Sequence, residues 1–452
     1  MSGSSSVTRQ VGWLLLSVLS AGSMAFYVAT IWSANQTPGF SDLYAGWWGT
    51  HELLLHGRDP YSTAVAHEIQ TVIYGAPLAP DSQDPTGIGG GFAYPLYAAI
   101  LLWPSVYLSF AVVQRAFLCA SILGTLFSLA IWLRLMRLVW SPVIWLTASI
   151  FALGSFPVLQ GIKLQNPSLL AASCIAIAFF LLFSERLVLA GAMFAIATFK
   201  PQFMILLIPW LVVWSAGDWR RRRPIAWGFL ATMCLLAAVS EWLLPGWMGS
   251  FLKVVRAYRH YTFGHSLLDV WFTPRWGLVM ASFVFLAVLV LGGRLRSKAA
   301  NSPEFLQVTS LVLAATVVVI PTLAPHAQLL LLPGLLCVVR DRTCLSSSGA
   351  LRRLVLVATW SLLAWPWIAA FGLLLAATRY PTHELLQYWE VPLYTSPLLP
   401  LAVLMGLVCL MTARGRKIGD SRLSNPRARR AHKGLRRQTQ GLLHVVWRPT
   451  LR

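Results

Sequence analysis

Acidic residues are scarce in this chain, and charge of either sign is rare. The 452 residues include 15 Asp and Glu against 36 Lys and Arg, and charged residues together make up only 11%. A soluble domain carries roughly 25% charged residues, so this is not the composition of a soluble globular protein. Hydrophobic residues account for 57% of the chain, which indicates a protein whose main solvent is lipid.

The sequence also lacks the motifs that bind nucleotides and catalytic metals. It has no P-loop, no glycine-rich dinucleotide fingerprint, and no Asp-x-Asp pair of the kind that holds a metal on a nucleotide sugar. No His and Glu have zincin spacing, and the six cysteines fit neither a disulfide nor a metal pattern. We therefore predict no metal and no cofactor. Five of the cysteines lie in apolar runs, where small core residues are expected: Cys119, Cys174, Cys234, Cys337 and Cys409.

Long apolar runs predict an all-α polytopic membrane protein with about twelve transmembrane helices. A hydrocarbon core of about 30 Å needs about 20 apolar residues per helix. The first run, 11–32, is too long for a signal peptide and has no small-residue cleavage site, so we expect it to remain as a helix. Several other runs have only 12 to 15 residues, which is tolerable where a helix is buried in protein or lines a wet cavity. The expected segments are 110–133, 143–156, 169–183, 188–199, 203–214, 225–244, 276–292, 305–322, 328–339, 354–378 and 392–412.

Basic residues cluster in the short loops between these runs and in the C-terminal tail. Residues 413–452 hold twelve Lys and Arg against one acidic residue. This is the positive-inside pattern, with a polybasic tail that can lie on anionic lipid, so we expect a membrane as partner and no nucleic acid. The pattern predicts a cytoplasmic N-terminus at 1–10, a transmembrane domain at 11–412 and a basic cytoplasmic tail at 413–452 of a multi-pass protein of the inner (plasma) membrane.

Residues 33–109 are predicted to form a loop on the outer side, rich in Gly, Pro, Asp and His. Within it, 92–107 is apolar but short, and a spanning helix there would place the next basic loop outside. We therefore expect a juxtamembrane helix along the outer surface, with Trp103 and Tyr107 at the level of the lipid headgroups.

Asp42 stands alone as an acidic residue about ten positions beyond the first apolar run, in Ser41-Asp42-Leu43-Tyr44. A carboxylate in this place lies at the outer membrane surface, where a general base meets a lipid-borne substrate. The placement predicts an integral-membrane enzyme with its active site facing the periplasm or the exterior.

Polar residues that follow short apolar runs are the further candidates for a site. Lys200 precedes Pro201 near the membrane midplane, and its charge there costs several kcal/mol unless it finds a partner or water. It either binds an anionic phosphate or extends to the interface. Gln165 and Asn166 lie at an outer junction of two helices. Their amide side chains either bind sugar hydroxyls or a phosphate oxygen, or simply form a capping turn.

An outer segment, 246–274, is rich in cations, against the positive-inside bias. Arg256 and Arg259 lie in it and Arg275 follows it, and a phosphate-bearing lipid is the natural partner of such groups. His326 begins a helix after Ala324-Pro325 and is either a structural residue or a partner of a phosphate or hydroxyl.

Several short motifs follow one another along the chain: Asp42-Leu43-Tyr44, then Leu-Leu-Leu-His-Gly-Arg-Asp-Pro-Tyr at 53–61, Phe92-Ala93-Tyr94-Pro95, Gln-Asn-Pro-Ser-Leu-Leu at 165–170, Ala-Gly-Ala at 190–192 before Lys200-Pro201, and Pro325-His326. Their order and spacing resemble the polytopic glycosyltransferases of family 87, which belong to the GT-C superfamily and include polyprenyl-phosphate-mannose-dependent alpha-1,2-mannosyltransferases. The resemblance covers roughly residues 10 to 340. Leu96 and Leu164 depart from it, since the family usually has Pro and Gly there.

The resemblance implies a GT-C-type fold and a glycosyltransferase that uses a polyprenyl-phosphate sugar, usually mannose, on the extracytoplasmic face. The sugar passes with inversion to a hydroxyl of a glycolipid or glycan acceptor. Asp42 matches the family's general base. The donor phosphate and sugar would be held by Lys200, His326, Gln165, Asn166, Arg256, Arg259 and Arg275, with Asp59, Tyr61 and Tyr94 in support.

Two other classes of protein remain possible on the sequence. A secondary transporter would place ionisable residues near the midplane within repeated halves, and the chain shows no internal repeat. A lipid-handling protein of cell-envelope polysaccharide export is the second alternative, and the isolated Asp42 with its cationic outer residues argues against it.

Overall fold

The computed structural model describes residues 3–36, 41–81, 84–262, 264–320, 324–346, 349–381, 388, 391 and 395–424. Every regular element in these ranges is a helix, and no β-strand occurs in them, which confirms the predicted all-α class. The last residues of the predicted basic tail, 425–452, lie outside the described part of the chain, whereas its first residues continue the helix α20 (Leu398–Ser424).

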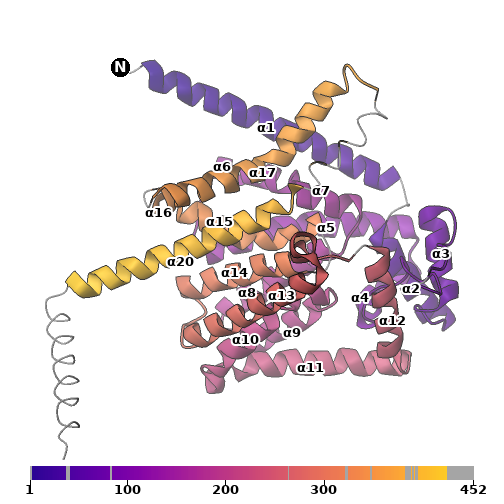
Figure 1. The fold of residues 1–452 in the computed structure, drawn as a ribbon. Helices are drawn as coiled ribbons and strands as arrows, with labels where there is room; N and C mark the ends of the chain where they lie inside the picture. The colour runs from indigo at the N-terminus through magenta and orange to yellow at the C-terminus, as the bar shows by residue number, and fades with distance from the viewer. Residues whose placement is uncertain are drawn as a thin grey trace, which may run out of the picture.

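Apolar helices form the body of the molecule and run roughly along one direction (Figure 1). The helices α8, α9 and α11 pack side by side, and α14 packs against α13, α15 and α20. The bounds of the body helices are α1 (Gly3–Gln36), α5 (Phe110–Leu135), α6 (Pro142–Leu153), α7 (Phe156–Lys163), α8 (Ser168–Phe183), α9 (Leu187–Ala197), α10 (Leu207–Ala216), α11 (Trp219–Leu243), α13 (Leu267–Leu295), α14 (Pro303–Val319), α15 (Leu332–Arg340), α16 (Arg342–Ser346) and α17 (Ala350–Ala376), with the 3-10 helices η2 (Pro201–Met204) and η3 (Pro325–Leu331).

Four of the described helices are long and apolar enough to cross a membrane, namely α5, α11, α13 and α17. The pair α6 and α7, bent by 51° at a short break, makes a fifth candidate. The remaining apolar helices have 10–17 residues, in line with the short runs of the sequence. The helical membrane protein is thus confirmed, and the number of twelve spans stays a prediction. The helix α7 extends the structure beyond residue 156, where the predicted segment ended, because the chain bends at Gly154 and Ser155 and then resumes a helix.

A second group of helices gathers at one end of the body (Figure 1). It consists of α2 (Asp42–His56), α3 (Thr63–Tyr74), α4 (Tyr97–Leu102), the 3-10 helix η1 (Trp103–Tyr107) and α12 (Trp247–Tyr261). The residues 33–109 were expected to be a loop with one surface helix, so α2 and α3 are additions. Trp103 and Tyr107 are exposed, with 55% and 69% of their surface accessible, as expected for rings at an interface.

Local sequence explains why α2 and α3 form. Ser41 and Ser62 cap their N-termini, since each side chain accepts a hydrogen bond from a backbone N–H of the first turn. Gly57 ends α2 with φ 64°, a left-handed conformation that glycine adopts without steric cost. These residues fix where α2 begins, and its first residue is Asp42.

The helices α9 and α11 cross at a very short distance. A Cβ on Gly191 would lie 2.1 Å from the carbonyl oxygen of Ile225, and one on Gly228 would lie 2.1 Å from that of Val188. The absence of side chains at both positions lets α9 and α11 approach closely, as small residues do between membrane helices. The crossing positions the C-terminal end of α9, which leads to Lys200.

Candidate active site

Asp42 is the first residue of α2 and is tied to a distant part of the chain. Its backbone N–H donates to the carbonyl oxygen of Leu164 at 2.9 Å. A helix N-terminus carries a partial positive charge, which favours a carboxylate at this position. The side chain of Asp42 keeps some accessible surface although protein atoms surround it on most sides.

The turn before α8 holds this carboxylate in place. The amide nitrogen Nδ2 of Asn166 donates to Oδ2 of Asp42, and Oδ1 of Asn166 accepts from the N–H of Ser168 at 2.9 Å. The hydroxyl of Ser41 donates to Oε1 of Gln165 at 2.5 Å. Ser41, Gln165 and Asn166 are all buried. Both amides were predicted to bind a sugar or phosphate oxygen; the structure shows that Asn166 binds Asp42 and that Gln165 binds its neighbour Ser41.

Lys200 lies close to the same carboxylate, at a break between two helices. Helix α9 ends at Ala197, and η2 begins at Pro201, which has no N–H to continue the helix. Lys200 is only 9% exposed, and its Nζ lies 5.0 Å from the centre of the Tyr94 ring, a cation–π contact. The Tyr94 hydroxyl donates to the backbone carbonyl oxygen of Asp42 at 3.2 Å. Tyr94 thus connects the acidic residue to the buried cation.

The electrostatics of the site are those of a carboxylate shielded from water. Burial raises the pKa of Asp42 above its ordinary value, while the charge of Lys200 and the hydrogen bond from Asn166 lower it in part. The balance leaves the pKa raised. Burial also raises the pKa of Tyr94 well above its usual range, helped by Asp42 and Tyr258, so Tyr94 stays a neutral hydrogen-bond donor. A raised pKa makes Asp42 a better proton acceptor than an exposed carboxylate.

His326 is a second buried polar residue near Lys200, and it comes from a distant part of the sequence. It lies in η3, which packs on α7, α8 and α14, and it is 9% exposed. The two side chains are close enough for the Lys200 charge to act on the imidazole. Its Nδ1 is buried without a hydrogen-bond partner among the residues that the structure describes. A buried polar nitrogen without a partner costs free energy, so this atom is a natural contact for a ligand.

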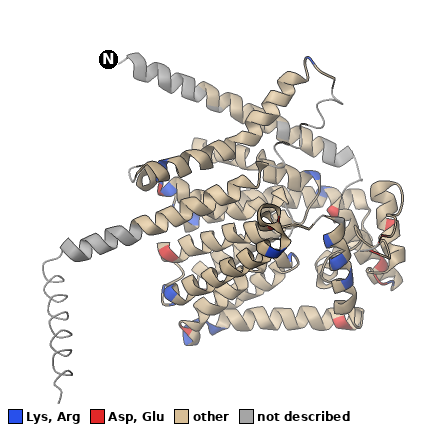
Figure 2. Cartoon of the chain, in the orientation of Figure 1, with Lys and Arg blue, Asp and Glu red and all other residues tan. Residues whose placement is uncertain are grey.

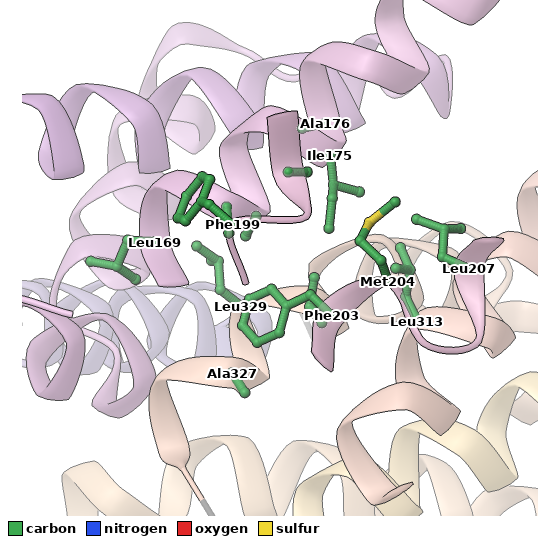
Figure 3. Packing of buried hydrophobic residues seen from close by; sticks show 14 of the residues in the cluster. Leu169, Ile175, Ala176, Phe199, Phe203, Met204, Leu207, Leu313, Ala327 and Leu329 are labelled. Atoms are coloured by element: carbon green, nitrogen blue, oxygen red, sulfur yellow. The ribbon is translucent and has the colours of Figure 1, made fainter. Parts of the chain in front are cut away.

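An apolar core packs around the segments that carry Lys200 and His326. Figure 3 shows Phe199 and Phe203, on either side of the break at Lys200, together with Ala327 and Leu329 of η3 and Leu169 of α8. All five are buried. Because close-packed side chains resist displacement, this core fixes the backbone of both polar residues relative to the turn that holds Asp42.

The supporting residues of the predicted site are joined in a chain of hydrogen bonds. Asp59 Oδ1 accepts from the backbone N–H of Tyr61 at 2.8 Å, and the Tyr61 hydroxyl donates to the carbonyl oxygen of Tyr94 at 2.8 Å. The Tyr61 ring packs on Phe92 and Phe251. The segment around Tyr61 therefore positions Tyr94, which in turn contacts Asp42.

The three predicted arginines lie on α12 and α13. Arg256 and Arg259 are exposed residues of α12, a helix with several basic positions (Figure 2), and Arg275 is an exposed residue of α13. Arg259 donates to the carbonyl oxygen of Gly264 at 3.3 Å. Within the described ranges, no contact joins these three arginines to Asp42 or Lys200. Their part in the site therefore stays a prediction.

Sequence reasoning missed Ser41, Leu164 and Tyr258. Ser41 could have been found, because serine before an acidic residue is a typical N-cap pattern. The carbonyl of Leu164 offers no signal in sequence. Tyr258 lies on the face of α12 that turns toward the body, beside the buried Val254 and Ala257. It is one of the groups that raise the pKa of Tyr94.

Comparison with known protein families gives a match. The family described as glycosyltransferase family 87 matches residues 92–348, which is more than half of the chain. Tyr94, Asn166, Lys200 and His326 lie inside this range, whereas Asp42 precedes it. No curated protein and no solved structure matches the chain.

Proposed function

Because the chain belongs to glycosyltransferase family 87 and is a membrane glycosyltransferase, we propose that it transfers mannose from a polyprenyl-phosphate donor to an acceptor hydroxyl. The observation that carries the proposal is the arrangement around Tyr94. Its hydroxyl donates to the backbone carbonyl oxygen of Asp42, whose carboxyl group has a raised pKa, and its ring contacts the buried ammonium group of Lys200. Membership of an enzyme family sets aside the alternatives of a transporter or a non-enzymatic lipid-handling protein.

The chemistry needs one base and one group that stabilises a departing phosphate. Asp42 accepts the proton of the acceptor hydroxyl as its oxygen forms a bond to the anomeric carbon. The bond from that carbon to the phosphate oxygen breaks on the opposite face, so the configuration inverts. The electron pair leaves with the polyprenyl phosphate, whose negative charge Lys200 stabilises. A phosphate leaves well without a second carboxylic acid, so a single carboxylate suffices.

A lipid-linked donor fits the composition and the motifs of the chain. Membrane anchoring restricts the donor to the plane of the bilayer and so supplies proximity to the site. The chain lacks the sequence motifs of a soluble nucleotide-sugar site. Lys200 and Asp42 interact electrostatically but form no direct ion pair within the described chain, an arrangement suited to a phosphate and a hydroxyl bound between them.

The direct test uses purified protein, radiolabelled polyprenyl-phosphate-mannose and membrane lipids. A new labelled glycolipid or glycan is the expected product, and inversion is read from the anomeric configuration of the bond formed. A labelled product that requires GDP-mannose instead would contradict the proposed donor.

The orientation of the site yields a separate prediction. The first residues of α1 and the last of α20 lie at the end of the molecule opposite to α2, α3, α4 and α12 (Figure 1), which supports a cytoplasmic side for both termini and an outer site. A membrane-impermeant thiol reagent should label Ser62→Cys in intact cells but not Ser421→Cys. Labelling of both variants after the membrane is permeabilised is the control. The reverse pattern in intact cells would overturn the positive-inside assignment.

Asn166 offers a prediction for the pH dependence of turnover. The reaction needs the deprotonated carboxylate, and the hydrogen bond from Asn166 lowers the pKa of Asp42. Asn166→Ala removes that bond, so the pKa rises further and turnover should be lost at a higher pH as the medium is acidified. Turnover at alkaline pH should be affected less. The pH–rate profiles of the variant and the wild type test this, and an unchanged acidic limb would show that Asn166 does not act on the base.

A further inference from the structure

A cluster of two histidines and a glutamate lies at the far end of α2 from Asp42. His51 and Glu52 are neighbours on this helix, and His56 is its last residue. Nδ1 of His51 lies 3.4 Å from Oε1 of Glu52, and Nδ1 of His56 lies 3.2 Å from the same oxygen. Metal-ligating atoms of the three residues lie within 4.8 Å of one another. Three groups that commonly ligate transition metals therefore converge on one point.

Two of the distances between these atoms match the ligand spacing around a small divalent cation. With bonds of about 2.0–2.1 Å to nitrogen and oxygen, adjacent ligands of a tetrahedral Zn²⁺ are about 3.3 Å apart. The two N–O distances of 3.4 and 3.2 Å lie close to this value. Three protein ligands with water in the fourth position is an arrangement that zinc accepts.

The surroundings of the cluster favour a cation in spite of the basic chain. Glu52 is 3% exposed, and Arg58 donates to its other oxygen, Oε2, at 2.7 Å. The second guanidinium nitrogen of Arg58 binds Glu68 at 2.6 Å. The carboxylates of Glu52 and Glu68 and the guanidinium of Arg58 together carry one net negative charge when both imidazoles are neutral. Arg58 thus acts as an outer partner that orients the carboxylate, and Oε1 remains directed at the imidazoles.

Both imidazoles are held and accessible as ligands should be. The Trp48 ring stacks on His51, with centroids 5.2 Å apart and planes 6° apart, and Trp48 Nε1 donates to Glu68 at 3.0 Å. The side chain of His56 is 52% exposed, which provides an entry path from solvent.

We propose that His51, Glu52 and His56 form a binding site for a divalent transition-metal ion, Zn²⁺ by the chemistry of its ligands. The ion binds to Nδ1 of both imidazoles and to Oε1 of Glu52, and it displaces the protons that otherwise occupy the Nδ1 positions. The site joins the last turn of α2 to its middle. Tyr44 stacks on Trp48 with centroids 6.1 Å apart, so the stacked rings continue from the metal ligands to the turn that carries Asp42. The role of the ion is to stiffen α2.

Cobalt binding to the full-length protein tests this site. The protein is purified in detergent with a tag that contains no histidine, treated with a chelator, freed of the chelator and titrated with Co²⁺. One Co²⁺ per chain should bind with the visible absorption of tetrahedral coordination, and Zn²⁺ should displace it. Zn²⁺ should also raise the melting temperature in proportion to the logarithm of its concentration above the dissociation constant.

Variants identify the ligands. Because loss of an outer partner alone typically costs 10–100-fold in affinity, His56→Gln and His51→Gln should each weaken binding by at least about tenfold. His260→Gln is the matched control, since His260 lies on α12 and binds Asp81 at 2.7 Å, away from the cluster, and this variant should leave binding unchanged. Two results would overturn the proposal: a wild-type protein that binds no stoichiometric Co²⁺ or Zn²⁺, which would mean that protons alone occupy the cluster, or binding that persists in both His→Gln variants. Neither result bears on the glycosyltransferase reaction, because binding is measured without substrate.

Discussion

Replacing Asp42 by asparagine is expected to lower turnover by about 10²–10⁴-fold, the usual contribution of a general base. The asparagine oxygen can still accept the hydrogen bond from Asn166, and the backbone bond to Leu164 is unchanged. The shape of the site therefore survives while its basicity is lost. Binding of the lipid-linked donor should change little, because Asp42 acts on the acceptor.

Turnover is measured with the radiolabelled polyprenyl-phosphate-mannose as the sole donor, and folding is followed by the melting temperature. Glu185→Gln provides a matched control: Glu185 is an exposed carboxylate that pairs with Arg221, and it lies between α8 and α9, outside the candidate site. This variant should keep full turnover. An Asp42→Asn enzyme within twofold of the wild type would remove Asp42 from the mechanism, and a different base would have to be found.

The class of the protein and the central pair of its site follow from residues that are unusual for their surroundings. A lone carboxylate after an apolar helix and a lysine beside a helix-ending proline are both costly in lipid, so each marks a place where protein must compensate. The structure brings Asp42 and Lys200 near each other through Tyr94, a residue that the family-like motif Phe92-Ala93-Tyr94-Pro95 included. Composition alone predicted the helical membrane body.

The partners of these residues could not be predicted, because they depend on how distant segments meet. Asn166 was expected to bind a sugar hydroxyl or a phosphate oxygen, or to form a capping turn, and the fold adds a partner that the sequence did not indicate, since its Nδ2 donates to Asp42. Arginines near the outer surface were grouped with Lys200 by charge, yet the side of a helix on which a residue lies decides what it can reach. Tyr258, four residues after Val254 and on the same face of α12, approaches Tyr94, while Arg256 points outward.

The cluster of His51, Glu52 and His56 was missed for a related reason. A search for two histidines four positions apart finds pairs on one face of an ideal helix. His51 and His56 are five positions apart, which places them on different sides of a regular helix. Their rings nevertheless lie 5.2 Å apart, since His56 is the terminal residue of α2 and its side chain folds back over Glu52. The convergence of the three side chains becomes visible only when the end of α2 at His56 is known.

Replacing Lys200 by methionine should weaken binding of the polyprenyl-phosphate donor by roughly 10 to 150-fold. The estimate follows from the loss of one charge-assisted hydrogen bond to phosphate, worth about 1.5–3 kcal/mol, because each 1.4 kcal/mol changes affinity about tenfold. Methionine fills a similar volume against the Tyr94 ring and the apolar core, so the fold should persist. Acceptor affinity should be nearly unchanged, since the hydroxyl binds at Asp42.

The initial rate is measured as a function of donor concentration and, separately, of acceptor concentration, which distinguishes a change in donor binding from a change in acceptor affinity. Lys298→Met serves as the control. Lys298 is a half-exposed lysine that approaches Glu304 at 3.9 Å after α13, so its loss should leave the donor concentration dependence as it is.

His326→Gln should weaken donor binding less than Lys200→Met, because a neutral imidazole offers the phosphate a hydrogen bond without a full charge. Added Mg²⁺ or Mn²⁺ should not raise the rate, since no second carboxylate accompanies Asp42 in an Asp-x-Asp pair. Unchanged donor dependence in Lys200→Met would rule out the ammonium group as the phosphate partner, and direct use of GDP-mannose by the wild type would rule out the lipid-linked donor itself.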